Sequence, residues 1–334
     1  MALEINSPLY DYSGTLAPYM ITKAMFGMET IKKGLVYVKD NIRKQHTITR
    51  ENLDKPLSKR QTTPTDDGTD PFVLDGRMIV PKDIQAYREF NPRDLESTQY
   101  GEELTSRIVD RYMPDNVAQQ MLKVFLGRSA EWIEKCTWEG STAYQDENLY
   151  PAGSDQSQLQ FFDGFMKLWV NDTSVVKIAS PVALTTSNII AKMYLLYQQM
   201  ATDKPAMLAT EESFDRIKFI MNVKTSALYQ EAQANLTFKG SPLSAKYVAA
   251  LAQYQIEVVP GMPDDTIAFC EATDDINSNL WVGMNSQEDW NVKIGQPMPM
   301  GELWAMLAKW KYAVQYGWSD QIFLYTTKTA ANYQ

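Results

Sequence analysis

The sequence predicts an α+β protein with more than one structural unit, because the chain is long, has one long helix and places its strands in separate regions. Its 334 residues exceed what a single hydrophobic core usually organises. Residues 114–138 begin with a helix-start signal and carry apolar side chains at helical spacing. Residues 309–316 alternate large apolar residues with smaller or charged ones, which is the period of a strand.

The region of residues 83–138 is the strongest helix prediction. Asn-Pro followed by acidic residues at 91–96 opens one expected helix, and Pro114 opens a second, longer one. About 20 residues give a rod of roughly 30 Å whose single apolar side suits packing across a sheet. Its expected buried face carries Val117, Met121, Val124, Phe125, Trp132 and Cys136.

The middle of the chain is predicted to be a compact mixed unit of strands and helices. Strands are expected at 175–178, 217–223 and 256–259, and helices from about 187 and at 244–253. Thr225 or Ser226 is placed to cap the helix after the second of these strands. One side of the helix from 187 carries Ile189, Met193, Leu196, Tyr197 and Met200. Later strands are expected at 265–270, 279–283 and 310–326.

Residues 34–82 predict a long two-stranded excursion with a polar tip. Strand-like runs at 34–39 and 42–50 precede the polar stretch 61–71, and strand character resumes at 72–80. An isolated hairpin is barely stable in water. A neighbouring subunit is therefore the expected support for this segment.

The charge of the chain is uneven. The net charge is −9, yet residues 32–60 hold nine Lys or Arg against three Asp or Glu. An acidic protein is a poor general binder of nucleic acid, whereas such a basic segment docks on an oppositely charged surface or is simply a solvated loop. The residues predicted to lie at a subunit interface are Lys39, Arg43, Lys44, Arg50, Lys55 and Arg60.

Catalytic motifs are missing from the sequence, so no enzymatic activity, cofactor or metal is expected. His46 is the single histidine and lies in the excursion, away from any predicted core. Neither a GxxxxGK[ST] loop nor a GxGxxG turn occurs, and no spacing suits a zinc site. Adjacent carboxylates at 102–103, 264–265 and 274–275 leave a carboxylate-dependent cytoplasmic enzyme as an alternative.

The location expected from the sequence is a reducing cytoplasm. Cys136 and Cys270 form no CxxC pair and are expected to be buried thiols rather than a disulfide. No apolar stretch approaches the 18 or so residues of a membrane span, and residues 1–6 lack the pattern of a signal peptide.

Several phrases, in their order along the chain, resemble the tailed-bacteriophage major capsid protein family, which has the HK97-like fold. VPKDIQAY at 80–87 with NPRDLE at 91–96, and WEG at 138–140 after the long helix, resemble parts of its peripheral domain. FFDGFM at 161–166 and YQIEVV at 254–259 resemble segments that introduce and end its axial domain. NLWVG at 279–283 and the strands of 310–325 resemble the peripheral sheet, so the likeness runs from about residue 76 to 326.

This resemblance implies a division of the chain into an arm, a loop and two domains. Residues 1–33 would be an N-terminal arm, and 34–82 an extended β-hairpin loop that reaches over an adjacent subunit. Residues 83–170 and 275–334 would form a peripheral domain with a long spine helix, and 171–274 an axial domain.

The family also implies a function in self-assembly. The chain would form hexamers and pentamers of an icosahedral shell around phage double-stranded DNA, which it would not bind sequence-specifically. Its other partners would be a separate scaffold protein, a portal and decoration proteins, and it would assemble in the cytoplasm of a bacterial host before residing in the virion. The alternative within the same fold is an encapsulin-like nanocompartment, which encloses cargo enzymes.

Overall fold

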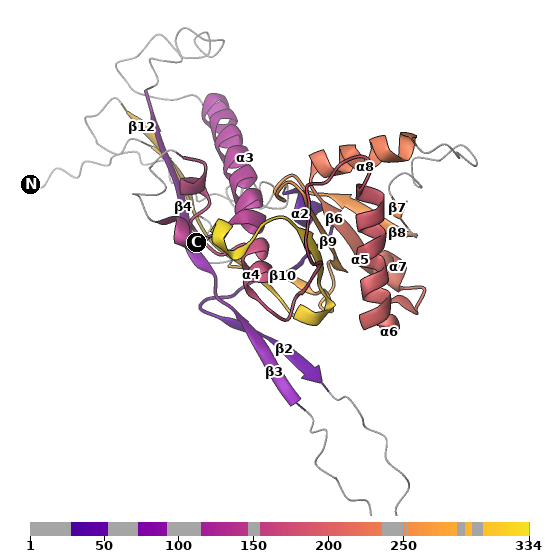
Figure 1. Cartoon of the computed structure of the whole chain (residues 1–334). Coiled ribbons are helices and arrows are strands. Elements are labelled where there is room, and N and C mark those ends of the chain that lie inside the picture. Colours follow the sequence, from indigo (N-terminus) through magenta and orange to yellow (C-terminus); the bar gives the residue numbers. More distant parts are fainter. Residues whose placement is uncertain are drawn as a thin grey trace, which may run out of the picture.

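Two β-sheets and a separate hairpin organise the chain in the computed structural model (Figure 1). The structure describes residues 28–52, 73–91, 115–145, 154–235, 250–251, 253–285, 291–295 and 303–333. Helices and strands follow one another without the regular alternation of a βαβ protein. The predicted α+β class is confirmed.

The first sheet has five strands and is built around the long strand β12 (Trp304–Tyr316). Antiparallel partners of β12 are β10 (Leu280–Met284), β11 (Asn291–Gly295) and β4 (Lys82–Phe90). The short strand β1 (Tyr37–Lys39) extends the sheet by pairing in parallel with β10. The strand predicted from the alternation at 309–316 is confirmed as the end of β12.

The second sheet has six strands, and its central strand β6 (Ile217–Met221) is buried along its whole length. The other strands, in sheet order around β6, are β5 (Val176–Lys177), β13 (Phe323–Thr326), β9 (Thr266–Glu271), then β8 (Tyr254–Val258) and β7 (Ala250–Leu251). Figure 1 shows the helices of this lobe beside the sheet: α5 (Ile189–Asp203), α6 (Pro205–Leu208), α7 (Ser213–Arg216) and α8 (Val223–Asn235).

The helix α5 confirms the stripe predicted from residue 187 onward. Ile189, Met193, Leu196 and Met200 are fully buried against the second sheet, and Tyr197 is partly buried beside them. These residues recur every three or four positions, so one face of α5 supplies a continuous apolar stripe to the core.

The long helix α3 (Asp115–Glu139) is confirmed, and its predicted buried face is confirmed in part: Cys136 is buried, and Met121, Phe125 and Trp132 pack partly buried against the core. The side chain of Val117 lies outside the described residues. Leu122, Leu126 and Ile133 are buried against the core, whereas Val124 is 61% exposed. Apolar residues occupy two adjacent faces of α3, and spacing alone does not reveal which face meets α4 (Phe165–Asn171) and β12.

Residues 83–90 form a strand rather than the predicted helix. Every residue of β4 has a partner in β12, so sheet pairing overrides the local preference for a helix. Most of β4 is exposed and Ile84 is its one fully buried residue, which hides the period of two in the sequence. Residues 92–114, where the first of the two helices was expected to continue, lie outside the described residues.

Two smaller expectations in the second lobe are also wrong. Asn222 rather than Thr225 or Ser226 caps α8, because its Oδ1 accepts the Thr225 N–H at 2.7 Å. Ala250–Leu251, expected at the end of a helix, is the edge strand β7, while residues 244–249 lie outside the described part of the chain.

The predicted excursion contains one hairpin, β2 (His46–Asn52) paired with β3 (Val73–Ile79) in antiparallel register. Residues 34–39, expected to be its first strand, instead supply β1 to the first sheet. The polar stretch 61–71 lies outside the described residues.

The strands expected at 310–326 are divided between the two sheets. β12 ends at Tyr316 in the first sheet, and β13 pairs with β9 and β5 in the second. The segment between them therefore crosses from one sheet to the other, and it lies near the point where the hairpin leaves the body (Figure 1).

Candidate functional site

The hairpin of β2 and β3 projects away from the body, and polar contacts hold its root (Figure 1). Arg77 of β3 donates from Nη2 to Asp172 Oδ2 at 2.6 Å. The Arg77 guanidinium also lies over the Tyr316 ring, 4.2 Å from its centre. The Tyr316 hydroxyl donates to the same Asp172 oxygen at 2.6 Å. One carboxylate thus joins the hairpin to the end of β12.

These donors decide the charge state of Asp172. Burial opposes ionisation, but hydrogen bonds from Tyr316, from the Ser174 backbone and from Arg77 outweigh it and lower the pKa of Asp172 to about 2. Burial, together with the bond to this carboxylate, raises the pKa of Tyr316. The carboxylate is therefore ionised and the phenol protonated at any ordinary pH.

Arg50 of β2 makes the second attachment of the hairpin root. Its Nη1 donates to the Gly317 carbonyl at 3.3 Å, and its guanidinium lies 5.6 Å from the centre of the Trp318 ring. The buried Asn279 side chain holds this turn, because its Oδ1 accepts the Trp318 N–H at 2.7 Å and its Nδ2 donates to the Trp318 carbonyl at 2.9 Å. The hairpin therefore rests on a fixed turn.

The two faces of the hairpin differ in character. Toward the body, Ile48 and Ile79 are buried, and Ile79 packs with Ile42. On the opposite face Thr47 and Thr49 are exposed and Met78 is 56% exposed. Because directly paired strand residues share a face, Arg50 and Arg77 both point to the body.

The structure describes four of the six predicted interface residues, and they lie in different surroundings. Lys39 belongs to β1 and is partly buried in the first sheet, and Arg50 contacts its own subunit. Arg43 and Lys44 are exposed in the link between β1 and β2. Lys55 and Arg60 lie outside the described residues. Their role at a subunit interface stays a prediction.

Sequence reasoning missed Arg77, Asp172 and Tyr316. Asp172 lies 95 positions from Arg77, and Tyr316 lies 144 positions beyond Asp172. No local motif links residues so far apart. The one available signal was that a two-stranded excursion needs charged or apolar anchors at its base, and this does not identify partners.

The single histidine and the two cysteines, all within the described residues, are not arranged for acid–base or nucleophilic catalysis. The His46 ring stacks on Trp281 with centroids 6.2 Å apart, and burial and the nearby Lys39 charge lower its pKa. Burial raises the pKa of the Cys136 and Cys270 thiols to about 12, which opposes thiolate formation. Among the described residues, no group of three or more acidic, histidine or cysteine side chains is placed to hold a metal ion.

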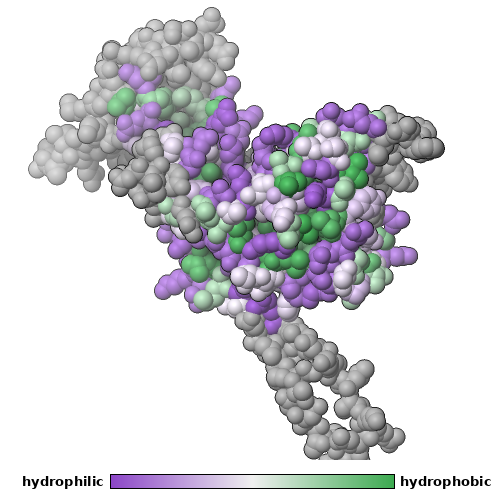
Figure 2. All heavy atoms as spheres, in the orientation of Figure 1, coloured by the Kyte–Doolittle hydropathy of each residue, from purple (hydrophilic) through white to green (hydrophobic). Residues whose placement is uncertain are grey.

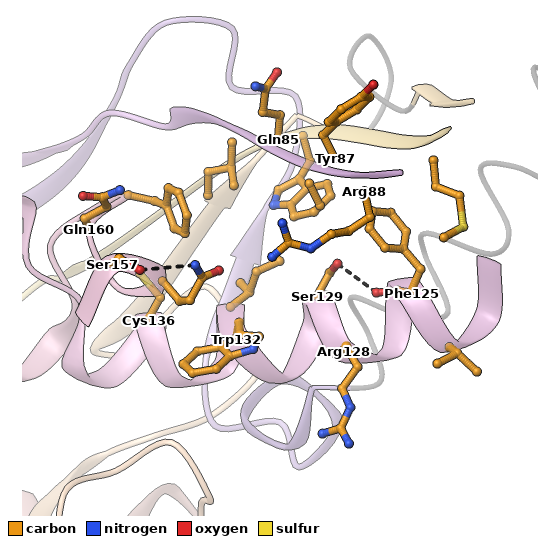
Figure 3. Close-up of a pocket in the computed structure, with 18 of the residues that line it drawn as sticks. Gln85, Tyr87, Arg88, Phe125, Arg128, Ser129, Trp132, Cys136, Ser157 and Gln160 are labelled. Atoms are coloured by element: carbon orange, nitrogen blue, oxygen red, sulfur yellow. Dashed lines mark hydrogen bonds between the residues drawn. The ribbon is translucent and has the colours of Figure 1, made fainter. Parts of the chain in front are cut away.

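A cavity of about 960 Å³ lies between α3 and β4 (Figure 3). Arg88 reaches from β4 toward α3, while Gln85 and Tyr87 point to the other side of the strand (Figure 3). The described residues that line the cavity include no carboxylate and no histidine, and its thiol is the poorly ionised Cys136. This lining offers apolar contact area rather than a general acid and base.

Figure 2 shows hydrophilic and hydrophobic residues interspersed over the described surface on this face. Within the residues that the structure describes, no helix combines the length and the apolar character needed to cross a bilayer.

Comparisons with known proteins identify the fold. No family model matches the chain, and no curated protein matches it. A solved structure of the satellite phage P4 procapsid, including its size determination protein, aligns with a TM-score of 0.54 at 10% identity, over 92% of this chain and 97% of that chain. The chain has the HK97-like capsid fold.

Two more solved structures support this HK97-like fold. A virus-like particle from Pyrococcus furiosus aligns with a TM-score of 0.52 at 11% identity, over 92% of this chain and 97% of that chain. The capsid of Myoviridae phage XM1 aligns with a TM-score of 0.52 at 11% identity, over 89% and 91%. At these identities the likeness establishes the fold, and function must be argued from the site.

Proposed function

We propose that this chain is a structural protein that self-assembles into a closed shell, as a phage major capsid protein. The observation that carries the proposal is the hairpin of β2 and β3, which Arg50 and Arg77 anchor at its root and which turns the exposed Thr47, Thr49 and Met78 away from its own body. A two-stranded ribbon is marginal in water unless something covers it. Another copy of the chain is the partner that symmetric assembly supplies.

The expected division of the chain belongs to this proposal. Residues 1–33 would act as an arm and 34–82 as the loop that reaches a neighbour. The peripheral domain would comprise 83–170 and 275–334, and the axial domain 171–274. Under this division β13 would lie in the axial sheet although its sequence lies in the peripheral range.

The contents of the shell define two versions of the proposal. We favour phage double-stranded DNA, because a chain with a net charge of −9 is a poor general binder of phosphate, and a lining with this property would let the genome move. Portal, scaffold and decoration proteins would then be partners, and the virion the final location. An encapsulin-like compartment is the alternative, and particles purified from the native source would contain an enzyme instead of DNA.

Electron microscopy of the protein expressed alone, with light scattering for mass, tests the proposal. We expect closed particles or rings of five and six copies. A single monomeric or dimeric species, unchanged by a co-expressed scaffold protein from the same source, would contradict self-assembly.

A substitution on the outer face of the hairpin tests how the shell is held. Met78→Asp places a charge where we propose contact with a neighbour, so particle yield should fall at least tenfold. The subunit itself should keep its stability within about 0.5 kcal/mol, because the side chain is mostly exposed. Ile276→Asp, at a residue 64% exposed in the body, is the matched control. Normal particles from Met78→Asp would remove this face from the interface.

A further inference from the structure

Three connecting passages of the described chain, two of which join the two sheets, meet beneath the hairpin root. Residues 172–175 lead from α4 to β5, residues 272–279 from β9 to β10, and residues 317–322 from β12 to β13. Asn279 on the second passage bonds to Gly317 and Trp318 on the third. The first passage joins them through Asp172, which accepts the Tyr316 hydroxyl.

Both strands of the hairpin form hydrogen bonds to these passages. Arg77 of β3 binds Asp172 on the first passage, and Arg50 of β2 binds Gly317 on the third. β5 and β13, which begin just beyond these two passages, pair with each other in parallel. A rotation of the hairpin root would therefore act on the start of two adjacent strands in the second sheet.

Burial makes the Arg77–Asp172 ion pair more sensitive to its geometry than an exposed ion pair is. Its side chains are 24% and 17% exposed, against 75% and 62% for the Arg128–Glu131 pair on α3. Both pairs have the same separation of 2.6 Å between nitrogen and oxygen. Water screens the exposed pair, whereas the half-buried pair loses far more when its geometry changes.

One hydrogen-bond donor at the root of the hairpin nevertheless lacks a partner. The buried Arg77 Nε–H has no acceptor among the described residues. A buried donor without a partner is costly and is rare without a reason. The missing hydrogen bond destabilises the present direction of the hairpin. It therefore reduces the free-energy difference between this direction and one in which the Arg77 Nε–H has an acceptor.

We propose that Arg50, Arg77, Asp172, Tyr316 and Trp318, together the crossover clamp, couple the direction of the hairpin to the relative placement of the two sheets. A partner that holds the hairpin in a new direction shifts the sheets, and a shift of the sheets redirects the hairpin. The coupling is a property of the folded subunit and does not depend on the proposed shell.

Hydrogen–deuterium exchange on the full chain tests the coupling from both sides. Tyr316→Phe removes a hydroxyl from the body side and keeps the ring under Arg77; exchange in the hairpin strands 46–52 and 73–79 should then quicken about tenfold. Arg77→Lys perturbs the hairpin side, and exchange at 176–178 and 323–326 should quicken comparably, because coupling is reciprocal.

Glu131→Gln is the matched control, since it removes an ion pair of equal length that is exposed on α3. It should leave exchange in all four segments unchanged. Light scattering must show the same assembly state for every variant. If each substitution changes exchange only within its own segment, the clamp is a pair of local bonds and the proposal fails.

Discussion

The root of the hairpin and the C-terminal end of α3 both join distant segments, but by opposite kinds of contact. At the root, long polar side chains span the space between the hairpin and the body. At the end of α3, backbone meets backbone: Gly140 N–H donates to Cys136 O, and Gly164 N–H donates to Gly140 O, both at 2.9 Å. Trp138 and Phe165 are completely buried beside them.

This difference teaches how the fold separates a rigid part from an adjustable one. Close-packed backbone and aromatic rings admit a single arrangement, because any shift opens a void or creates a clash. An arginine side chain can keep one hydrogen bond while it changes another. Its contacts therefore orient the hairpin and still allow the hairpin to move. The fold has the first kind in its core and the second at the root of the hairpin, which we propose contacts a neighbouring copy.

The largest loss of subunit stability is expected from Gly140→Ala. A Cβ at this position would lie 2.5 Å from Phe162 O and closer still to Cys136 O, so backbone must move. Overpacking of this kind costs about 1–3 kcal/mol and occasionally more. We expect a lower midpoint of chemical denaturation or failure to accumulate soluble protein.

Gly127→Ala is the matched control for this prediction. Gly127 lies within α3, and no heavy atom outside the local helix backbone lies within 4 Å of the Cβ that it would gain. Alanine should stabilise the helix by about 0.5–1 kcal/mol at this position. Equal effects of the two substitutions would show that α3 ends in a looser contact than described.

A smaller effect is expected at the hairpin root, from Arg50→Glu. This change removes the hydrogen bond to Gly317 and the contact with Trp318, which should lower the free energy of unfolding by about 0.5–1.5 kcal/mol. The double variant Arg43→Glu/Lys44→Glu changes exposed residues and should leave subunit stability within about 0.5 kcal/mol. Denaturation of the two variants, with particle counts, separates the anchor from the proposed interface.

If the double variant both unfolds more easily and assembles normally, the exposed link stabilises the subunit instead of contacting a neighbour. The predicted interface role of Arg43 and Lys44 would then be wrong. A stable Arg50→Glu subunit would show that its bond to Gly317 contributes little to the root.

The smallest effect is expected from Glu134→Gln, and it depends on pH. Glu134 on α3 is buried and accepts hydrogen bonds from the hydroxyl and the N–H of Thr30. Burial raises its pKa despite these bonds, and the nearby Glu29 charge adds to the rise. The folded protein therefore holds this proton more tightly than the unfolded chain does, and stability falls as the pH rises through the raised pKa.

Denaturation from about pH 4 to 7 should show this slope, since the unfolded glutamate has a pKa of about 4.3. Relative to Glu134→Gln, the wild type should lose stability across this range. Asp172 titrates in the opposite sense and below about pH 4, so it does not mask the effect. A stability difference that is constant with pH would contradict the raised pKa of Glu134.

Local patterns in the sequence predicted the long helix α3, the stripe of α5 and the pairing of the excursion. Each depends on residues close together in the chain: helical spacing for α3 and α5, and strand runs either side of a polar tip for the hairpin. The uneven charge and the lack of catalytic motifs also limited the functions to consider. Part of the buried face of α3, the strand β4 and the cap at Asn222 were missed, because neighbours from other segments decide each of them.

The clamp could not be predicted, because its bonds link β3, the residue after α4 and the end of β12. Composition showed that arginines lie near the excursion, and it could not show that Arg50 and Arg77 turn inward. Their direction follows from the strand register and from the three connecting passages that meet beneath the hairpin root. Patterns along the chain specify helices and strands. The packing of those elements decides which charged side chains contact the rest of the subunit and which stay exposed.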